Sequence, residues 1–239
     1  MEYLKEIIDK FFITDDRWRY FTDGLLITLQ VTAGALLLGL VIGIVVSIIR
    51  SSHDQIKQEE LSLPARTVFW LLNTVARLYL TVIRGTPTLV QLLLFYFFFL
   101  QNLESKVMAA TIAFGINSGA YLAEIFRSGI MSIDQGQMEA GRSLGLSYTV
   151  TMRKIILPQA FKNALPALIN EIITLLKETS ISGYIGLNDL TRGAEIVGGA
   201  TYEQLIPLLA AAVVYLAVVM FFTWIMGIVE RRLRESDRR

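Results

Sequence analysis

Apolar residues gather in long runs that short polar segments separate. Four runs are nearly free of charge: Leu25–Ile49, Val107–Ile125, Leu165–Leu176 with its flanks, and Leu205–Val229. A hydrocarbon core of ~30 Å needs about 20 helical residues at ~1.5 Å per residue. The pattern therefore predicts a polytopic, all-α membrane protein.

A fifth apolar stretch, Val68–Leu100, is longer than one crossing requires, and Arg84-Gly85-Thr86-Pro87 interrupts it. We expect Val68–Ile83 to be an amphipathic lead-in at the cytoplasmic interface. A break at Gly85 and Pro87 then feeds a single crossing that ends near Gln101. This interpretation gives five transmembrane helices, and the alternative, two separate crossing helices, gives six.

Lysine and arginine predict the orientation, because cytoplasmic loops carry the excess of positive charge. The basic tail 230–239 is expected in the cytoplasm, together with segment 131–162 and the loop Arg50–Arg66. With five crossings, segment 1–20 and the N-terminus are external, as is the Gly-rich loop 186–204. We expect one transmembrane domain over residues 1–239.

Composition supports a membrane protein and excludes several functions. The chain is 54% hydrophobic and has a mean hydropathy of +0.53, more apolar than soluble domains. A net charge of +1 gives no basic field for nucleic acid, and zero cysteines with one loop histidine, His53, leave no expected metal site or catalytic residue. The N-terminus lacks the features of a cleaved signal, so we expect the first helix to be retained.

The most informative motif is Met138–Pro158, MEAGRSLGLSYTVTMRKIILP. It resembles the EAA loop of ABC transporter permeases, which has EAA, three residues, Gly, nine residues and Ile-x-Leu-Pro. The resemblance implies coupling helices that dock into a groove on an ATPase subunit, with these residues in the motif: Glu139, Ala140, Gly141, Arg142, Gly145, Ile155, Leu157 and Pro158. Gly141 replaces the usual second Ala, which is expected to loosen the helix by ~1 kcal/mol. Pro158 is expected to end the motif where the chain turns.

Further segments resemble importers of histidine, glutamine, arginine and similar amino acids. They are RGTP with LVQ, NSGAYLAEIFR, GQ, LPQA, NE and LKETS, in order between Arg84 and Ser180. The resemblance implies a type I ABC importer fold in the bacterial cytoplasmic (inner) membrane. It also implies three kinds of partner: two ABC ATPases that use ATP and Mg, a second permease chain, identical or homologous, and an external binding protein. No phosphate-binding loop G-x-x-x-x-G-K-S/T occurs, so we expect this chain to bind no cofactor itself.

Polar residues inside the predicted spans are candidates for contact with the solute, because ionisable groups are costly in a bilayer. Glu171, Thr174 and Glu178 share one helical face and form a surface for a cation. The expected lining of the path also includes these residues: Gln91, Asn117, Ser118 and Tyr121. Two carboxylates favour basic solutes such as arginine, lysine or histidine. A purely structural pairing of both glutamates is the alternative.

Two further charged groups are expected to have structural or gating roles. Glu124 and Arg127 are spaced as an i, i+3 ion pair near the cytoplasmic end of their helix. Arg84 is interpreted as an anchor, with contact to the coupling loop or to lipid phosphate as the functional alternative.

One other transporter class remains open. A secondary amino acid transporter driven by an ion gradient also holds carboxylates at mid-membrane, although its frequent inverted repeats are not apparent here. An intramembrane enzyme has no nucleophile or acid–base set in this sequence.

Overall fold

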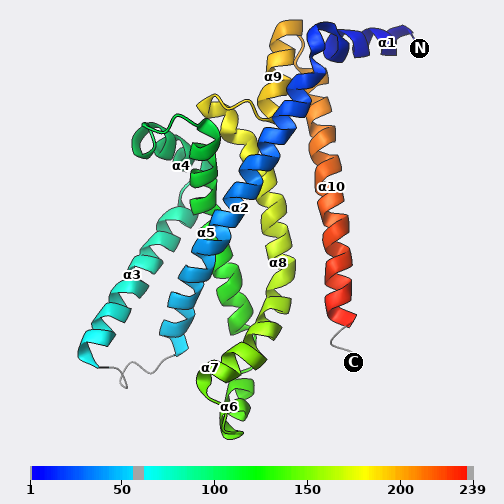
Figure 1. The fold of residues 1–239 in the computed structure, drawn as a ribbon. Helices are drawn as coiled ribbons and strands as arrows, with labels where there is room; N and C mark the ends of the chain where they lie inside the picture. Colours follow the sequence, from blue (N-terminus) through cyan, green and yellow to red (C-terminus); the bar gives the residue numbers. More distant parts are fainter. Residues whose placement is uncertain (1, 56–61, 236–239) are drawn as a thin grey trace. The chain divides into compact units, whose positions relative to one another are not determined.

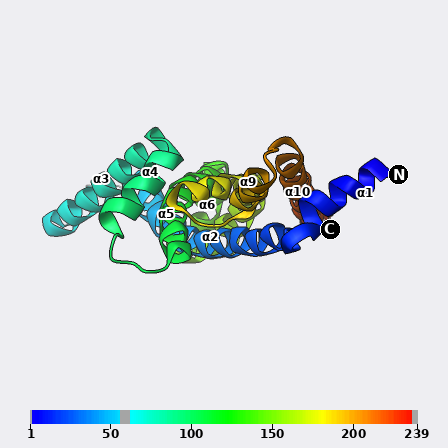
Figure 2. The ribbon, with the colours of Figure 1, turned by 90° about the horizontal axis from the view of Figure 1, so that it is seen from above.

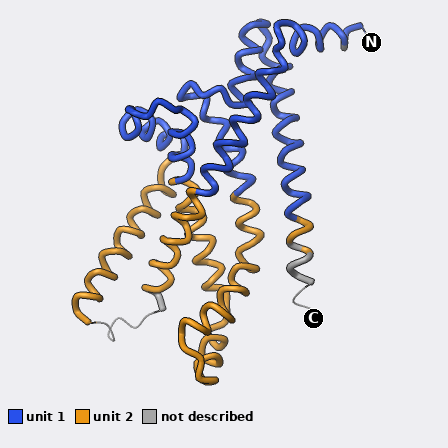
Figure 3. Tube along the Cα trace, in the orientation of Figure 1, with its two compact units in different colours: residues 1–37, 87–115, 172–226 blue, residues 38–86, 116–171, 227–239 orange. Residues whose placement is uncertain are grey.

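The computed structural model describes residues 2–55 and 62–235, and every regular element in these ranges is helical (Figure 1). Part of the loop Arg50–Arg66 and residues 236–239 of the predicted tail lie outside the described residues, as does Met1. The described chain groups into two compact units (Figure 3). Unit 1 contains residues 1–37, 87–115 and 172–226, and unit 2 contains residues 38–86, 116–171 and 227–239.

Unit 1 contains the short elements of the chain's predicted external segments. The N-terminal α1 (Glu2–Ile8), η1 (Asp9–Ile13) and η2 (Thr14–Asp16) precede the long α2 (Trp18–Gln55), whose first half belongs to this unit. The other elements wholly inside it are α4 (Thr88–Leu94), η4 (Phe95–Phe99), η6 (Thr179–Ile185) and α9 (Leu190–Thr201). The helix α10 (Leu205–Glu235) contributes all residues up to 226.

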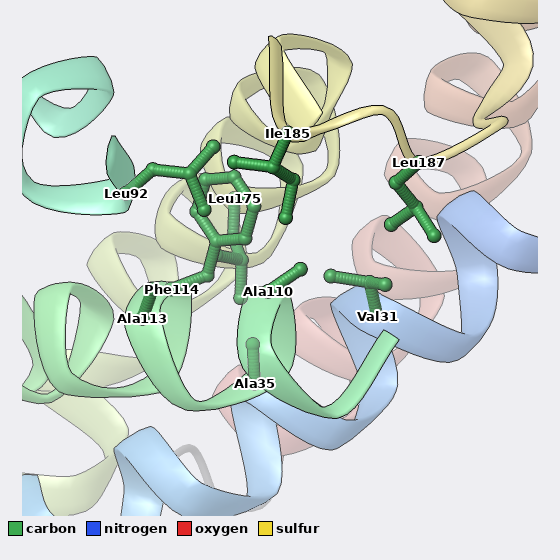
Figure 4. Close-up of a cluster of buried hydrophobic side chains, with 9 residues drawn as sticks. All are labelled: Val31, Ala35, Leu92, Ala110, Ala113, Phe114, Leu175, Ile185 and Leu187. Carbon is green, nitrogen blue, oxygen red and sulfur yellow. The ribbon is translucent and has the colours of Figure 1, made fainter. Parts of the chain in front are cut away.

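Two apolar clusters form the core of unit 1. The first joins α2, α4, the start of α5 (Lys106–Met131), the end of α8 (Leu157–Glu178) and η6, with Phe114 and Leu175 at its centre (Figure 4). The second packs α9 against η1, α2 and α10 through Phe11, Leu190 and Ala211. The views from the side and from above agree that α9 lies beside the start of α10 and that α1 extends away from them (Figures 1 and 2).

Unit 2 consists of α3 (Leu63–Gly85), α6 (Gln135–Ser143), α7 (Tyr148–Thr151) and η5 (Met152–Ile156), together with parts of α2, α5 and α8. Its core joins α3 to α5 through Leu80, Ile83 and Ala120. Helices α5 and α8 approach very closely at Gly129, where an added Cβ would lie 2.7 Å from the Ala160 carbonyl oxygen. Only glycine allows this contact, which brings the two helices together beside a cavity of about 680 Å³.

Two described helices are long and apolar enough to cross a membrane: α2 over Trp18–His53 and α10 over Leu205–Val229. The pair formed by α3 and Thr88–Phe99 meets the same measure only when its two parts are taken together. Helices α5 and α8 have the length of a span, but their polar residues make them less apolar than lipid-exposed helices. Helices surrounded by protein need less apolar character, so five crossings stay a prediction.

The interrupted apolar stretch has a different division from the expected one. Its break lies where the sequence predicts, with α3 ending at Gly85 and extended backbone at Thr86 and Pro87 before α4. The first part is longer than expected because α3 already begins at Leu63 and contains 23 residues. The second part, Thr88–Phe99, is short for a span. Helix α3 has the length of a span, but it meets the measure of length and hydropathy only together with Thr88–Phe99, so the expectation that the second part forms the crossing stays a prediction.

Candidate functional site

A cavity of about 680 Å³ lies within unit 2, between α3, α5 and α8. Its volume is within the roughly 300–1,000 Å³ range of small-molecule sites. The polar part of its lining comes from these residues: Arg84, Tyr121, Glu124, Ser128, Ser132, Lys162 and Asn163. The wall thus offers both signs of charge, which suits a zwitterionic ligand.

Glu124 is the centre of the charged wall. Its Oε2 atom lies 3.2 Å from Arg127 Nη2 on the same helix and 3.7 Å from Arg84 Nη1 on α3. The guanidinium of Arg84 also lies over the ring of Tyr121, 5.7 Å from its centroid. The predicted i, i+3 pair of Glu124 and Arg127 is confirmed, and the contact from Arg84 gives that residue an ion-pairing partner.

Two predicted solute-contact residues bind each other. The hydroxyl of Ser118 on α5 donates to Oε1 of Glu171 on α8 at 2.7 Å. Ser118 is fully buried and Glu171 is half-buried. Asn117 is also buried, beside Ser118 in the sequence, whereas Tyr121 lines the cavity described above. A carboxylate in a hydrogen bond between two helices is consistent with either predicted role of Glu171.

The other predicted solute-contact residues belong to unit 1. Gln91 is buried on α4, Thr174 is exposed on α8, and Glu178 is half-buried at the end of α8. The expected set of seven residues is therefore divided between the two units. A role for all seven in one site stays a prediction.

The predicted coupling segment is a helical hairpin in unit 2. Asp134 caps the start of α6 by accepting from the Gly136 backbone N–H at 2.7 Å. The helix ends at Ser143 with Leu144 as its C-cap, and the next residue, Gly145, has a φ of +83° that is strained for other residues. The N–H of Leu146 donates to the Gly141 carbonyl at 3.1 Å and that of Gly145 to the Arg142 carbonyl at 3.0 Å. This is the Schellman arrangement, which explains the glycine at this position of the motif.

Close packing explains Gly141, which departs from the usual alanine. Gly141 is buried, and an added Cβ would lie 2.5 Å from Cγ2 of Thr151 on α7. The residue therefore allows α6 and α7 to touch. Glycine at this position is expected to loosen α6, but it also allows the contact with Thr151, which alanine would prevent.

The expectation that Pro158 turns the chain was wrong. The backbone stays helical from Tyr148 through η5 into α8, where Pro158 is the second residue. Proline lacks an N–H and crowds the carbonyl four residues earlier, so the preceding turn widens into the π-helix η5. The side-chain amide of Gln159 donates to the Ile155 carbonyl at 2.8 Å, which satisfies one of the acceptors in this wider turn.

The coupling hairpin exposes most of its motif residues. Exposed positions are Glu139, Ala140, Arg142, Gly145, Leu157 and Pro158, whereas Ile155 is half-buried. Glu139 and Arg142 also line a cavity of about 510 Å³ with apolar residues of α5, α6 and η5. Leu144, at the tip, has 81% of its surface exposed. An exposed apolar tip with charges beside it is typical of a protein-binding surface.

Several site residues were absent from the sequence-based set. Lys162 and Asn163 line the cavity of about 680 Å³, and Arg84 and Glu124 face it rather than acting only as an anchor and an intrahelical pair. Only Glu124 carries a charge inside a predicted span, which was the available signal. The partners could not be read from one sequence, because the contacts join different helices.

Comparison with known proteins identifies close relatives. Residues 62–235 match the family described as "Binding-protein-dependent transport system inner membrane component". The chain is 40% identical over 221 residues to the arginine transport system permease protein ArtQ of Bacillus subtilis, covering 91% of this chain and 94% of that one. It is 38% identical to a putative glutamine transport system permease protein of Rickettsia typhi, with 90% and 93% coverage.

Solved structures give the same result. An amino acid ABC transporter crystallised with histidines matches with a TM-score of 0.76 and 39% identity, over 89% of this chain and 94% of that one. The MetNI methionine ABC transporter matches with a TM-score of 0.75 over 92% and 99% of the chains. At 18% identity, the second likeness supports the fold alone.

Proposed function

Because this chain belongs to the family of binding-protein-dependent transport system inner membrane components, we propose that it is the permease subunit of an ATP-driven importer of polar amino acids. The observation that carries the proposal is 40% identity over nearly the whole length of an arginine permease. The other relative named above is a putative glutamine transport system permease protein. Arginine and glutamine share an α-ammonium and an α-carboxylate.

The energy comes from a partner. Two ATPase subunits, which bind ATP and Mg, dock on the coupling hairpin of α6 and α7. The exposed Leu144 supplies an apolar contact, and Glu139 and Arg142 supply charged ones. The Schellman turn at Gly145 and the close contact at Gly141 make the hairpin stiff enough to transmit motion.

The solute passes through the cavity of about 680 Å³ in unit 2. The Arg84 guanidinium meets its carboxylate, and the Glu124 carboxylate meets its ammonium. Each solute charge replaces one partner of the existing ion pair, so neither protein charge is left unpaired. Glu171 and Glu178 do not line this cavity, but as predicted solute-contact carboxylates of the path they favour positively charged solutes, which makes arginine, lysine or histidine the preferred class.

A second permease chain completes the path. The exposed stripe of α8 contains Asn163, Asn170, Thr174 and Lys177, at helical spacing. Polar groups facing lipid are costly, so a second copy or a homologue covers this stripe or shares a water-filled path with it. An external binding protein delivers the solute to the loop 186–204, which includes α9.

Topology follows from the same proposal. The chain crosses the bacterial inner membrane five times, through α2, α3, α5, α8 and α10. The N-terminus is external and the C-terminus is cytoplasmic. In support, the coupling hairpin and the basic end of α10 then share the cytoplasmic side with the loop after α2.

Reconstitution tests the proposal against a carrier driven by an ion gradient. The chain is placed in vesicles with its ATPase and binding protein, and radiolabelled arginine uptake is measured. Uptake should require ATP and the ATPase. Uptake by this chain alone on a sodium or proton gradient would establish the secondary transporter instead.

A further inference from the structure

The segment formed by α1 and η1 in unit 1 is amphipathic. Its backbone is helical without a break, because Ile8, where the two elements meet, has right-handed helical angles. Tyr3, Ile7 and Ile8 lie on one side of α1 at helical spacing, whereas the charged Lys5 and Glu6 lie on the other. This pattern is typical of a helix that lies at the boundary between an apolar and a polar phase.

Contacts with the rest of unit 1 orient this segment. Phe11 is fully buried in the apolar cluster that α9 and α10 share, and Ile7 packs against the same cluster. Among the charged residues of the segment, Lys10 has its Nζ atom 3.3 Å from Glu203 Oε2, in the connection between α9 and α10. The apolar side therefore faces a helix that can span the membrane, and a charged residue meets the connection that precedes this span.

A strained turn separates the segment from α2. Asp15 and Asp16 have positive φ angles of 55° and 53°, which cost about 1–2 kcal/mol for each non-glycine residue. Arg17 stabilises the turn, because its Nη1 donates to the Lys10 carbonyl and its Nη2 lies 3.0 Å from Asp15 Oδ2. The segment consequently does not continue along α2 but extends away from α9 and α10 (Figures 1 and 2). A change of direction held at this cost indicates that the position of the segment has a function.

Two apolar residues of this segment are left uncovered. Tyr3 and Ile8 have 74% and 48% of their surface exposed. At the start of α2, Trp18 and Tyr20 are also exposed, and aromatic residues of this kind concentrate where a spanning helix meets the membrane surface. The segment therefore leaves α2 at the level of the membrane interface.

We propose that α1 and η1 lie flat on the membrane at the N-terminal end of α2, with Tyr3 and Ile8 in contact with lipid. Lipid is the expected occupant because the apolar side faces along the spanning helix α10, while the segment extends beyond the other helices of unit 1. In the proposed topology this is the outer leaflet. The segment contains three acidic and two basic residues, so burial of apolar surface holds it there rather than attraction to charged lipid.

Spin labels on single cysteines test this position, because the chain has no native cysteine. The complex with its native partner subunits is placed in phosphatidylcholine nanodiscs with a nitroxide on Tyr3→Cys or on Ile8→Cys. The unsubstituted complex gives the background from the partners, and size-exclusion chromatography checks assembly. Power saturation then compares access of oxygen, which concentrates in lipid, with access of a water-soluble nickel chelate. Both labels should be several-fold more accessible to oxygen than to the chelate.

Glu6→Cys is the matched control, because Glu6 is exposed on the polar side of the same helix. Its label should have the reverse preference. Preference for the chelate at all three positions would place α1 in water and overturn the proposal. Low access of both agents to the Tyr3→Cys and Ile8→Cys labels would assign the surface to a second permease chain instead. Loss of chelate access only after the external binding protein is added would assign it to that protein.

Lipid charge provides a further test. Replacing part of the phosphatidylcholine with phosphatidylglycerol should leave the oxygen preference unchanged, because the charges of α1 and η1 nearly cancel. A preference for oxygen that appeared only with phosphatidylglycerol would contradict apolar burial as the cause. None of these measurements requires transport, so this proposal and the import proposal can fail separately.

Discussion

Arg84 and Glu124 form an ion pair, with 3.7 Å between Nη1 and Oε2. The pair lines both the cavity of about 680 Å³ and a cavity of about 430 Å³ between α2, α3 and α5. Glu124 also binds Arg127, so its charge is divided between two cations. Such a shared carboxylate can exchange one partner for a ligand without losing the other. The pair is therefore well placed to recognise a zwitterion.

Removing the charge of Glu124 should impair import. Glu124→Gln keeps the size of the side chain but leaves Arg84 without its carboxylate and the solute ammonium without a partner. We expect ATP-driven arginine uptake to fall by about tenfold or more, the loss typical of a hydrogen bond to a charged group. Uptake into proteoliposomes measures this change.

Glu104→Gln is the control for that variant, because Glu104 is exposed in the segment between η4 and α5. It should transport like wild type. Normal uptake by Glu124→Gln, in protein that assembles with the ATPase, would show that the ion pair has no part in solute recognition.

Variants of the hydrogen bond between Ser118 and Glu171 can distinguish a structural role of Glu171 from a role in binding the solute. Glu171→Gln retains an acceptor for the Ser118 hydroxyl but removes the charge, so it should abolish uptake of basic solutes and leave the melting temperature nearly unchanged. Ser118→Ala should instead lower stability, by roughly 1–3 kcal/mol, because the Glu171 oxygen loses its donor. Uptake and thermal melting are measured on the same preparations.

The double variant Glu171→Ala/Glu178→Ala extends this experiment. It should stop transport while leaving assembly with the ATPase intact, as size-exclusion chromatography can determine. Wild-type uptake by this variant would remove both glutamates from the proposed path.

The contact between Gly141 and Thr151 predicts that substitutions at these two positions have non-additive effects on stability. Alanine has the higher helix propensity, but its Cβ would meet Thr151 Cγ2 at 2.5 Å, so Gly141→Ala should be destabilising by about 1–3 kcal/mol. In a Thr151→Ala background Cγ2 and Oγ1 are gone and the Cβ remains, 3.2 Å from the added Cβ, so the same change should cost clearly less. A double-mutant cycle on melting and on ATP-coupled uptake measures the interaction. Additive effects would mean that the contact is not significant.

Helices with long apolar runs could be predicted from the sequence, because a helix that lipid surrounds on most sides has apolar residues on most of its faces. This holds for α2 and α10, and the break at Gly85 and Pro87 was equally clear. The start of α3 at Leu63 was missed because Arg66 and Arg77 interrupt the apolar pattern. Those arginines face a cavity or solvent on one side of an amphipathic helix. The hydropathy along the sequence mixes this polar side with the apolar side, so the helix start is hidden.

The site was predictable only in part. Local pairs such as Glu124 and Arg127 follow from helical spacing, and the coupling hairpin follows from its motif. Contacts between helices, such as Ser118 with Glu171, depend on the rotation and register of each helix, which one sequence does not specify. Composition could identify the charged residues but not their partners.

Burial of Asp189 predicts a pH dependence of stability. This residue lies in the loop before α9, outside the membrane-spanning helices, and is fully buried because α2 passes close to it at Gly24. Burial raises the pKa of its carboxyl from 3.8 to about 6, although the backbone N–H groups of Arg192 and Thr191 partly oppose the change. The native state therefore binds a proton that the unfolded state has already released between pH 3.8 and 6.

The sign follows from this difference in bound protons. The contribution of Asp189 to stability is greatest at low pH, decreases as pH rises through that window, and is constant above it, with a total loss of about 3 kcal/mol. Asp189→Asn keeps a capping side chain without the charge, so its melting temperature should exceed that of wild type at pH 7 and converge with it near pH 4. Asp134→Asn makes the same change at an exposed cap and should retain the wild-type profile. Parallel profiles for Asp189→Asn and wild type would mean that the buried carboxyl titrates no differently in the folded and unfolded chains.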